Sequence, residues 1–236
     1  MLPDRYSSAT VYLFAALARA QRRGVLLLVL LVFCVFLNLA AGNAAASQQH
    51  LQTQIASGEQ VSAAAADRSY ERVRSYGMVQ VGLFLVTGFV WLLWLHSSYE
   101  LLRHLGTKVT RFSPGQAVGA WFVPFVNLVR PYQVVSELRL RTRNLNATAE
   151  PQPLTSGEIT ALWWLTWLAA NVTELLYAAF LGTAKTADVI VVADKIGFAG
   201  NALEAAAALL AYYLVRQIHN AQKLAAVPAA ATPAVA

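Results

Sequence analysis

Two acidic residues lie inside apolar segments, and each follows an asparagine at the same spacing. Asn171 and Glu174 occur in the sequence NVTE, and Asn201 and Glu204 occur in the sequence NALE. Residues three apart lie on the same face of a helix, so each Asn shares a face with its Glu. Ionisable groups inside a membrane are rare and mark proton relays, cation sites or ligand anchors. The pattern predicts a buried polar cluster of two carboxyls and two amides.

The segments that carry these pairs are long and apolar. The chain is 57% hydrophobic and 13% charged, against about 25% charged residues in soluble domains. A bilayer crossing needs about 20 apolar residues, and four segments of about that length occur, at about 25–42, 78–96, 159–181 and 196–215. A cleaved signal peptide is the rival interpretation of the first segment, whose apolar run is long for such a peptide. We therefore predict an all-α integral membrane protein built as a four-helix transmembrane bundle.

The depth of the two carboxyls decides whether they can meet. The last two spans run in opposite directions, and a rise of 1.5 Å per residue puts Glu174 about 10 Å and Glu204 about 13 Å from the outer end of each helix. The two carboxyls can therefore share a depth. A second interpretation is that these groups only hold helices together, because Asn and Glu side chains contribute about 0.6 kcal/mol per interhelical contact. The small residues from Gly197 to Ala208 suit such close packing.

The distribution of positive charge predicts the orientation. Segments 1–24, 97–154 and 216–236 hold 13 of the 18 Lys and Arg residues, whereas segments 43–77 and 182–195 hold five. Lys and Arg concentrate in cytoplasmic loops, so we expect both termini on the cytoplasmic side of a bacterial inner membrane. The net charge of +6 has the same explanation, and no nucleic-acid recognition motif accompanies it. Nucleic acid is therefore not expected as a partner.

The segments that precede, connect and follow the spans of the membrane domain, residues 25–217, carry their own patterns. Apolar residues at helical spacing in segment 1–24, among them Val11 and Phe14, predict an amphipathic helix at the cytoplasmic interface. The outer loop 43–77 is rich in Ala, which favours two helical extensions of the first two spans that turn near Ser57. A disordered linker is the alternative there. The tail 218–236 is of low complexity, and its last stretch, AAVPAAATPAVA, is expected to be disordered.

A short apolar run lies between the second and third spans. Residues 117–129 are mostly apolar, but the run is interrupted by Pro124 and is too short to cross a bilayer. We expect residues 112–130 to form a re-entrant or interfacial element packed inside the mouth of the bundle, because irregular backbone at membrane depth must be covered. Pro131 then begins an amphipathic basic helix over 131–145. Its arginines are expected at the membrane surface, near anionic lipid headgroups: Arg139, Arg141 and Arg143.

The same region carries a resemblance to a known family. The run FSPGQAVGAWFVPFVNLVRPYQVVSEL, followed by WWLTWLAAN, resembles the DUF4328 family of uncharacterised bacterial membrane proteins over residues 98–217. The residues that carry this signature are Trp121, Pro124, Asn127, Arg130, Pro131, Tyr132, Gln133 and Glu137. The chain departs from the family at Gln116, an amide where an aromatic residue is usual. The resemblance implies a four-crossing architecture with a cytoplasmic signature, and it implies no activity.

Motifs of enzymes and metal sites do not occur in the sequence. There is no P-loop, G-x-G-x-x-G, HExxH or G-x-S-x-G motif, and Cys34 has no second cysteine to pair with. The first function that we expect is therefore a non-enzymatic accessory or scaffold subunit of a membrane complex. It would act through helix packing. Its expected partners are membrane lipid and either another protein or a second copy of the chain. The alternative is a small transporter or a ligand- or ion-binding membrane protein that uses the buried Asn and Glu cluster.

Overall fold

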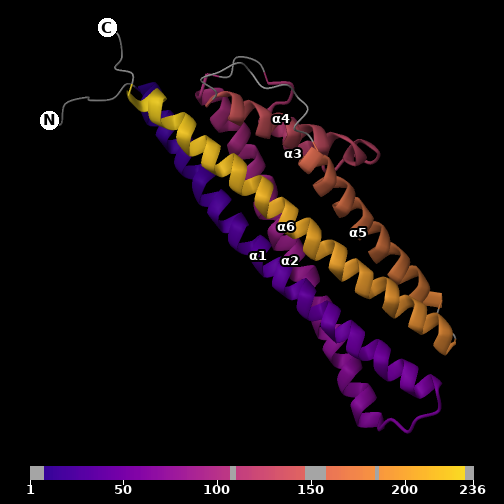
Figure 1. Ribbon diagram of the computed structural model, residues 1–236. Coiled ribbons are helices and arrows are strands. Elements are labelled where there is room, and N and C mark those ends of the chain that lie inside the picture. Colours follow the sequence, from indigo (N-terminus) through magenta and orange to yellow (C-terminus); the bar gives the residue numbers. More distant parts are fainter. Residues whose placement is uncertain (1–7, 107–109, 147–157, 184–185, 232–236) are drawn as a thin grey trace. The chain divides into compact units, whose positions relative to one another are not determined.

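The computed structural model describes residues 8–106, 110–146, 158–183 and 186–231. Within these ranges the chain is helical and contains no strand, which confirms the predicted all-α class. The helices in chain order are α1 (Ser8–Ala56), α2 (Ala63–His104), α3 (Pro114–Gly119), the short 3-10 helix η1 (Val126–Leu128), α4 (Arg130–Asn144), α5 (Glu158–Thr183) and α6 (Ala187–Ala231) (Figure 1).

Four of these helices, α1, α2, α5 and α6, are long and apolar enough to cross a membrane by length and composition. Their outer faces are apolar: Phe36, Leu85 and Leu175 are 66%, 64% and 72% exposed. These apolar side chains are not covered by the rest of the protein. Exposed apolar surface of this kind is typical of faces that contact lipid. The prediction of four apolar helices of spanning length is confirmed.

A tight turn joins α1 to α2 (Figure 1). The amide of Gly58 donates to the carbonyl of Ile55 at 3.1 Å, and the amide of Glu59 donates to the carbonyl of Gln54 at 3.0 Å. This pair of bonds is a Schellman motif, which needs a residue in the left-handed region, and Gly58 has φ +82°. Segment 43–77 is therefore helical on both sides of the predicted turn.

The chain divides into two compact units. The first unit contains Met1–Val29, Thr87–Ala161 and Tyr212–Ala236, and the second contains Leu30–Val86 and Leu162–Ala211. α1, α2, α5 and α6 each contribute residues to both units.

The start of the chain differs from the prediction of a separate interfacial helix. Residues from Ser8 onward belong to the same continuous helix as the first predicted span. Its packed face consists of Leu13, Ala16 and Ala20, which form a small core with Leu101 of α2. Val11 and Phe14, which we expected on the apolar interfacial face, are exposed and do not belong to this packed face. Small residues at helical spacing allow close helix contact, and this contact determines which face is buried.

The end of the chain also differs from its prediction. α6 continues to Ala231, so most of the segment that we expected to be disordered is helical. Residues 232–236 lie outside the described part of the chain. Ile218 and Gln222 are 1% and 0% exposed, so this helix is held by packing as well as by its Ala content.

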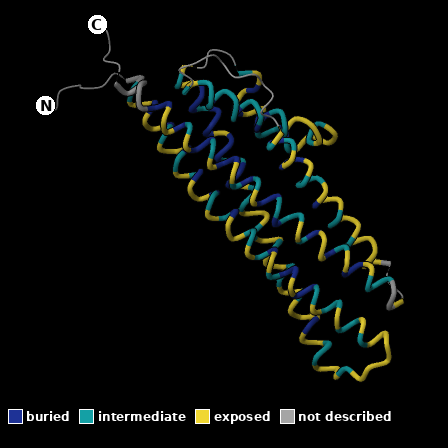
Figure 2. Tube along the Cα trace, viewed as in Figure 1, coloured by how far each residue is buried: buried dark blue, intermediate teal, exposed yellow. Residues whose placement is uncertain are grey.

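The short apolar run of the first unit folds as α3, an irregular turn and η1. α3 begins with a capping box, in which the Ser113 hydroxyl accepts from the Gln116 amide and the Gln116 side chain accepts from the Ser113 amide. The side chain of Gln116 therefore forms part of the helix cap. The turn after α3 is mostly exposed (Figure 2). Phe122 and Phe125 are 70% and 86% exposed, whereas Ala117 and Ala120 of the same element are buried, so the predicted packing inside the mouth of a bundle is not confirmed.

α4 begins where the sequence predicts, with Pro131 in its first turn. Val134, Val135 and Leu138 are fully buried along one face. Thr142 is buried on the same face, and Leu145 is the exposed C-cap residue. The opposite face of α4 is left to carry the polar side chains described below.

Candidate functional site

A network of three amides lies in the second unit. Gln80 of α2 donates through Nε2 to Oδ1 of Asn38 at 2.6 Å and to Oδ1 of Asn201 at 2.7 Å. The two asparagines in turn donate to backbone carbonyls of their own helices, those of Cys34 and Gly197. The network ties α1, α2 and α6 together through polar groups in apolar surroundings, where unpaired amides are costly.

The two predicted glutamates lie beside this network. A Cβ placed on Gly200 would be 2.7 Å from Oε1 of Glu174, so the carboxyl of α5 lies directly against the backbone of α6. Glu204 interacts electrostatically with Glu174 and with Asn38. The structure therefore brings together Glu174, Asn201 and Glu204, three of the four residues in the predicted cluster. The fourth, Asn171, is exposed and donates to the carbonyl of Trp167 in its own helix at 2.7 Å.

A pocket of about 270 Å³ opens next to the cluster, and we call it the acceptor pocket. Side chains of α1, α2, α5 and α6 line it, among them Glu174, Gln80 and Asn201. Two further residues that line the pocket each have a buried oxygen atom without a hydrogen-bond partner in the described chain. These atoms are Oδ2 of Asp194 and Oε1 of Gln48. Buried polar atoms are normally paired, so these two acceptors need a donor.

Aromatic rings complete the wall of the acceptor pocket. Tyr70, Tyr76 and Tyr177 line it together with the two carboxylates. A Cβ on Gly197 would be 3.2 Å from the ring of Tyr177, so the glycine leaves room for this ring against α6. Carboxylates and aromatic faces in one pocket are the groups that attract cations.

Sequence reasoning missed several members of this site. Asn38 and Gln80 are isolated amides within apolar spans, and Gln48 and Asp194 lie in segments that we assigned to outer loops. The signal for the first two was their rarity, since polar side chains inside a span need a partner. Nothing in the spacing of Gln48 or Asp194 indicated that they line the same pocket.

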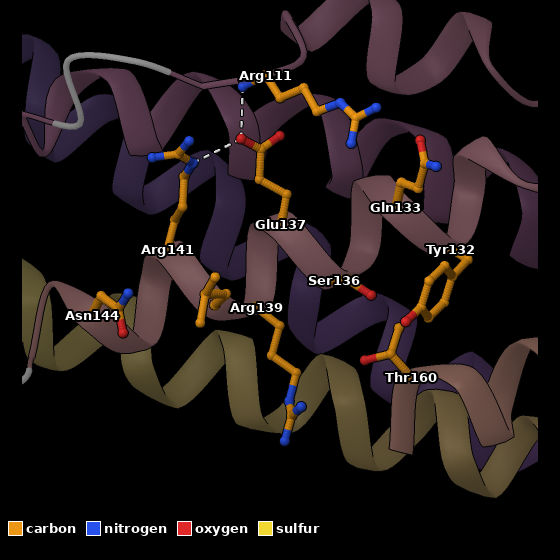
Figure 3. Close-up of a pocket in the computed structure, with 10 residues that line it drawn as sticks. Arg111, Tyr132, Gln133, Ser136, Glu137, Arg139, Arg141, Asn144 and Thr160 are labelled. Atoms are coloured by element: carbon orange, nitrogen blue, oxygen red, sulfur yellow. Dashed lines mark hydrogen bonds and ion pairs between the residues drawn. The ribbon is translucent and has the colours of Figure 1, made fainter. Parts of the chain in front are cut away.

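A second pocket lies in the first unit, on the polar face of α4 (Figure 3), and we call it the arginine pocket. Its volume is about 440 Å³. Tyr132, Gln133 and Glu137, which belong to the predicted signature, line it together with Arg139 and Arg141 of the predicted basic set. Arg143 is not among its lining residues.

Glu137 connects the parts of the arginine pocket. Its Oε1 accepts from Nε of Arg141 at 2.7 Å and from the backbone amide of Arg111 at 2.6 Å (Figure 3). Its Oε2 accepts from the hydroxyl of Tyr99 at 3.2 Å, and the same hydroxyl donates to the carbonyl of Val134 at 2.9 Å. One carboxylate therefore fixes α4 to α2 and to the segment before α3.

The arginines of α4 do not all lie on an open surface. Nε of Arg139 donates to Oε1 of Gln217 in α6 at 2.8 Å. Burial, and next the nearby Arg143, lowers the pKa of the Arg139 guanidinium from its ordinary value. An arginine side chain nevertheless keeps its charge at neutral pH. Arg139 and Arg141 thus line the pocket as well as adding positive charge to α4.

The remaining signature residues support the turn before α4. The ring of Trp121 lies 6.0 Å from that of Trp91, edge to face, and the guanidinium of Arg130 lies 5.9 Å from the Phe112 ring. Pro124 is exposed, Asn127 has a buried Oδ1 without a partner in the described chain, and Pro131 is buried in the first turn of α4.

Comparisons with known proteins complete the description. Within the described residues, no group of three or more His, Cys, Asp or Glu is placed to hold a metal ion. Neither the curated proteins nor the solved structures gave a significant match. The family described as "Domain of unknown function (DUF4328)" matches residues 57–220, which include α2 to α5, most of α6 and every lining residue of the arginine pocket. The match covers more than half of the chain, and the chain therefore belongs to the DUF4328 family.

Proposed function

We propose that the protein is a ligand-binding membrane protein that holds a small organic ammonium ion in the acceptor pocket. This is the second of the two functions expected from the sequence, and it includes a transporter of such an ion. The observation that carries the proposal is a pair of buried acceptor atoms that have no partner among the described residues, Oδ2 of Asp194 and Oε1 of Gln48, in the pocket that Glu174 also lines. An ammonium group supplies the N–H donors that these acceptors lack.

The walls of the pocket favour an organic cation over a bare metal ion. No set of three metal-ligating side chains is placed for coordination in the described residues. Three tyrosines line the pocket, and aromatic faces attract ammonium groups. The single arginine that lines it, Arg74, is 58% exposed and pairs with Glu71 at 3.5 Å. The carboxylates therefore dominate the charge of the buried part of the pocket.

Two ammonium probes test this proposal on the full chain in detergent. Propylammonium carries N–H donors and tetramethylammonium carries none, so propylammonium should bind at least tenfold more tightly if the unpartnered acceptors are the recognition groups. Isothermal titration calorimetry measures both affinities. Ligand that binds only the folded protein also raises the thermal midpoint, which gives an independent measurement.

Substitutions within the pocket should weaken propylammonium binding. Asp194→Asn and Glu174→Gln each remove one negative charge, and a lost charge-assisted hydrogen bond weakens binding about tenfold or more. Matched controls are Asp67→Asn and Glu59→Gln, which change the same groups at exposed positions that do not line the pocket. No binding of either probe at 100 mM, or equal effects of pocket and control substitutions, would rule out the proposal.

The accessory or scaffold function remains the second candidate, and the length of α1 favours it. A helix of 49 residues is about 74 Å long, whereas the hydrocarbon core is about 30 Å thick. The α1–α2 hairpin therefore extends well beyond a bilayer and exposes Ile55 near its tip. Native mass spectrometry after extraction in mild detergent should then find a protein partner, or a second copy of the chain, at fixed stoichiometry. Loss of that species in Ile55→Lys supports docking at the hairpin, and a bare single chain argues against this candidate.

The topology that we propose has four crossings in a bacterial inner membrane, with both termini in the cytoplasm and segment 112–130 at the cytoplasmic interface. The exposed apolar side chains of Phe122, Phe125 and Val129 support an interfacial position. In a Cys34→Ala background, a polarity-sensitive dye on Phe125→Cys should shift to the blue in liposomes, whereas a dye on Glu59→Cys should not. A green fluorescent protein fused to the C-terminus should fluoresce, because it does so only in the cytoplasm.

A further inference from the structure

The arginine pocket presents donors where the acceptor pocket presents acceptors. Arg111, Arg139 and Arg141 line it, and the only carboxylate among its lining residues in the described chain is that of Glu137. That carboxylate already accepts from Arg141 and from the amide of Arg111. The lining therefore has a positive balance after the internal ion pair is counted.

Two buried hydroxyls add to these donors. Oγ of Ser136 and Oγ1 of Thr160 are buried and have no hydrogen-bond partner in the described chain. Thr160 is 0% exposed and is one of the residues that line the pocket. Figure 3 shows Ser136, Tyr132 and Thr160 close to one another, with Glu137 between Arg111 and Arg141.

The size and the groups of the pocket together indicate its ligand. A volume of about 440 Å³ lies in the range of small-molecule sites. Guanidinium groups pair with phosphate oxygens through two parallel hydrogen bonds, and hydroxyls donate to the same oxygens. The Oδ1 atom of Asn144, also buried and unpartnered in the described chain, is placed to accept from a hydroxyl of the ligand.

We propose that the arginine pocket binds a phosphoryl group carried on a small hydroxylated molecule, such as the glycerol phosphate of a lipid headgroup or of a soluble metabolite. The site is distinct from the acceptor pocket, since all of its lining residues belong to the first unit. It also differs from general attraction of α4 to an anionic membrane, because recognition here depends on two uncharged hydroxyls.

The experiment uses the full chain and separates the two sources of the phosphoryl group. In the first arm, glycerol 3-phosphate is titrated into lipid-free protein in neutral detergent by calorimetry. In the second arm, nanodiscs of phosphatidylcholine with or without 20% phosphatidic acid are analysed by native mass spectrometry for a lipid retained at one per chain. Binding in the first arm assigns a soluble ligand, and retention only in the second arm assigns a headgroup. No binding in either arm overturns the proposal.

Variants test whether the pocket is responsible. Ser136→Ala and Thr160→Val remove one hydroxyl each without changing charge, and each should weaken binding about tenfold. Arg111→Gln should weaken it by more than tenfold, because it removes a charge while keeping the backbone amide that Glu137 accepts from. The matched control, Arg103→Gln, removes an exposed arginine from the same unit and should change binding less than twofold.

The two neutral substitutions keep the test clear of unspecific charge effects. An unchanged affinity in both Ser136→Ala and Thr160→Val, with unchanged circular dichroism, overturns the proposal. An equal loss in Arg103→Gln and Arg111→Gln overturns it as well, because general surface charge would then explain the binding. If Thr160→Val does not fold, Ser136→Ala alone still decides, since Ser136 is only partly buried and its hydroxyl makes no bond within the described chain.

Discussion

The contact between Gly200 and Glu174 gives a substitution that should separate stability from ligand binding. A Cβ on Gly200 would lie 2.7 Å from Oε1 of Glu174 and 3.1 Å from Oγ1 of Thr173. Ordinary contact begins at 3.4 Å, so in Gly200→Ala the carboxyl must move by about 0.7 Å. The carboxyl is the flexible end of its side chain and can move, whereas Thr173 is held by a 2.7 Å bond to the carbonyl of Ala170.

The expected change in stability is small because two terms oppose each other. Forcing a side chain away from its preferred rotamer costs about 0.5–1.5 kcal/mol. Replacing Gly by Ala within a helix gains about 1 kcal/mol. The free energy of unfolding should therefore change by less than about 0.5 kcal/mol, which corresponds to about 1–2 °C in the thermal midpoint for a chain of this size.

The expected change in binding is larger. If Glu174 pairs with an ammonium ligand, its displacement removes a charge-assisted hydrogen bond, which contributes about 1.5–3 kcal/mol, or at least a tenfold change in affinity. Calorimetry with propylammonium and a thermal melt of the same sample measure both quantities. Gly82→Ala is the control, since a Cβ there meets nothing within 4 Å, and it should leave the affinity unchanged.

Two results would refute this reasoning. An unchanged midpoint together with an unchanged affinity in Gly200→Ala would mean that Glu174 does not contact the ligand. A fall of more than about 5 °C in the midpoint would mean that the carboxyl cannot move aside, because overpacking of rigid groups costs about 1–3 kcal/mol.

Two further substitutions test the packing of the first unit. In Gly24→Ala the new Cβ would lie 2.7 Å from Nδ1 of His219 and 3.4 Å from Nε1 of Trp94, so the thermal midpoint should fall by several degrees, and adding His219→Ala should recover most of the loss. Glu137→Gln should destabilise the fold by about 1.5–3 kcal/mol in a thermal melt, because it weakens three hydrogen bonds to one carboxylate. Its control, Glu100→Gln, breaks an exposed pair with an arginine and should cost less than about 1 kcal/mol, so equal effects would contradict the role given to Glu137.

Features of the chain that depend on local pattern could be predicted from the sequence. The four long apolar helices, the turn at Gly58 and the start of α4 at Pro131 follow from run length, a glycine and a proline. The cap of α3 could also have been predicted, because Ser113 and Gln116 have the Ser-x-x-Gln spacing of a capping box. In each case the residues that decide the structure lie within a few positions of one another.

Features that depend on contacts between distant segments could not be predicted. Gln80 bonds to Asn38 and to Asn201, which are 42 and 121 residues away in the sequence. The exposure of Phe14 and the burial of Ala16 likewise depend on which face of α1 meets α2. A single sequence states how apolar a face is, but the choice between two apolar faces of a helix is made by the shape of the partner.

The two pockets differ in the charge of their lining groups, and this difference makes each proposal a control for the other. In the described chain, the acceptor pocket leaves a carboxylate oxygen of Asp194 without a partner, and the arginine pocket leaves the hydroxyls of Ser136 and Thr160 and the amide oxygen of Asn144 without one. Each pocket is lined by residues of one unit only. Asp194→Asn should therefore weaken propylammonium binding and leave glycerol phosphate binding unchanged, and Thr160→Val should do the reverse. A substitution that abolishes both would indicate a loss of folding, because ligands of opposite charge share no recognition group in these two sites.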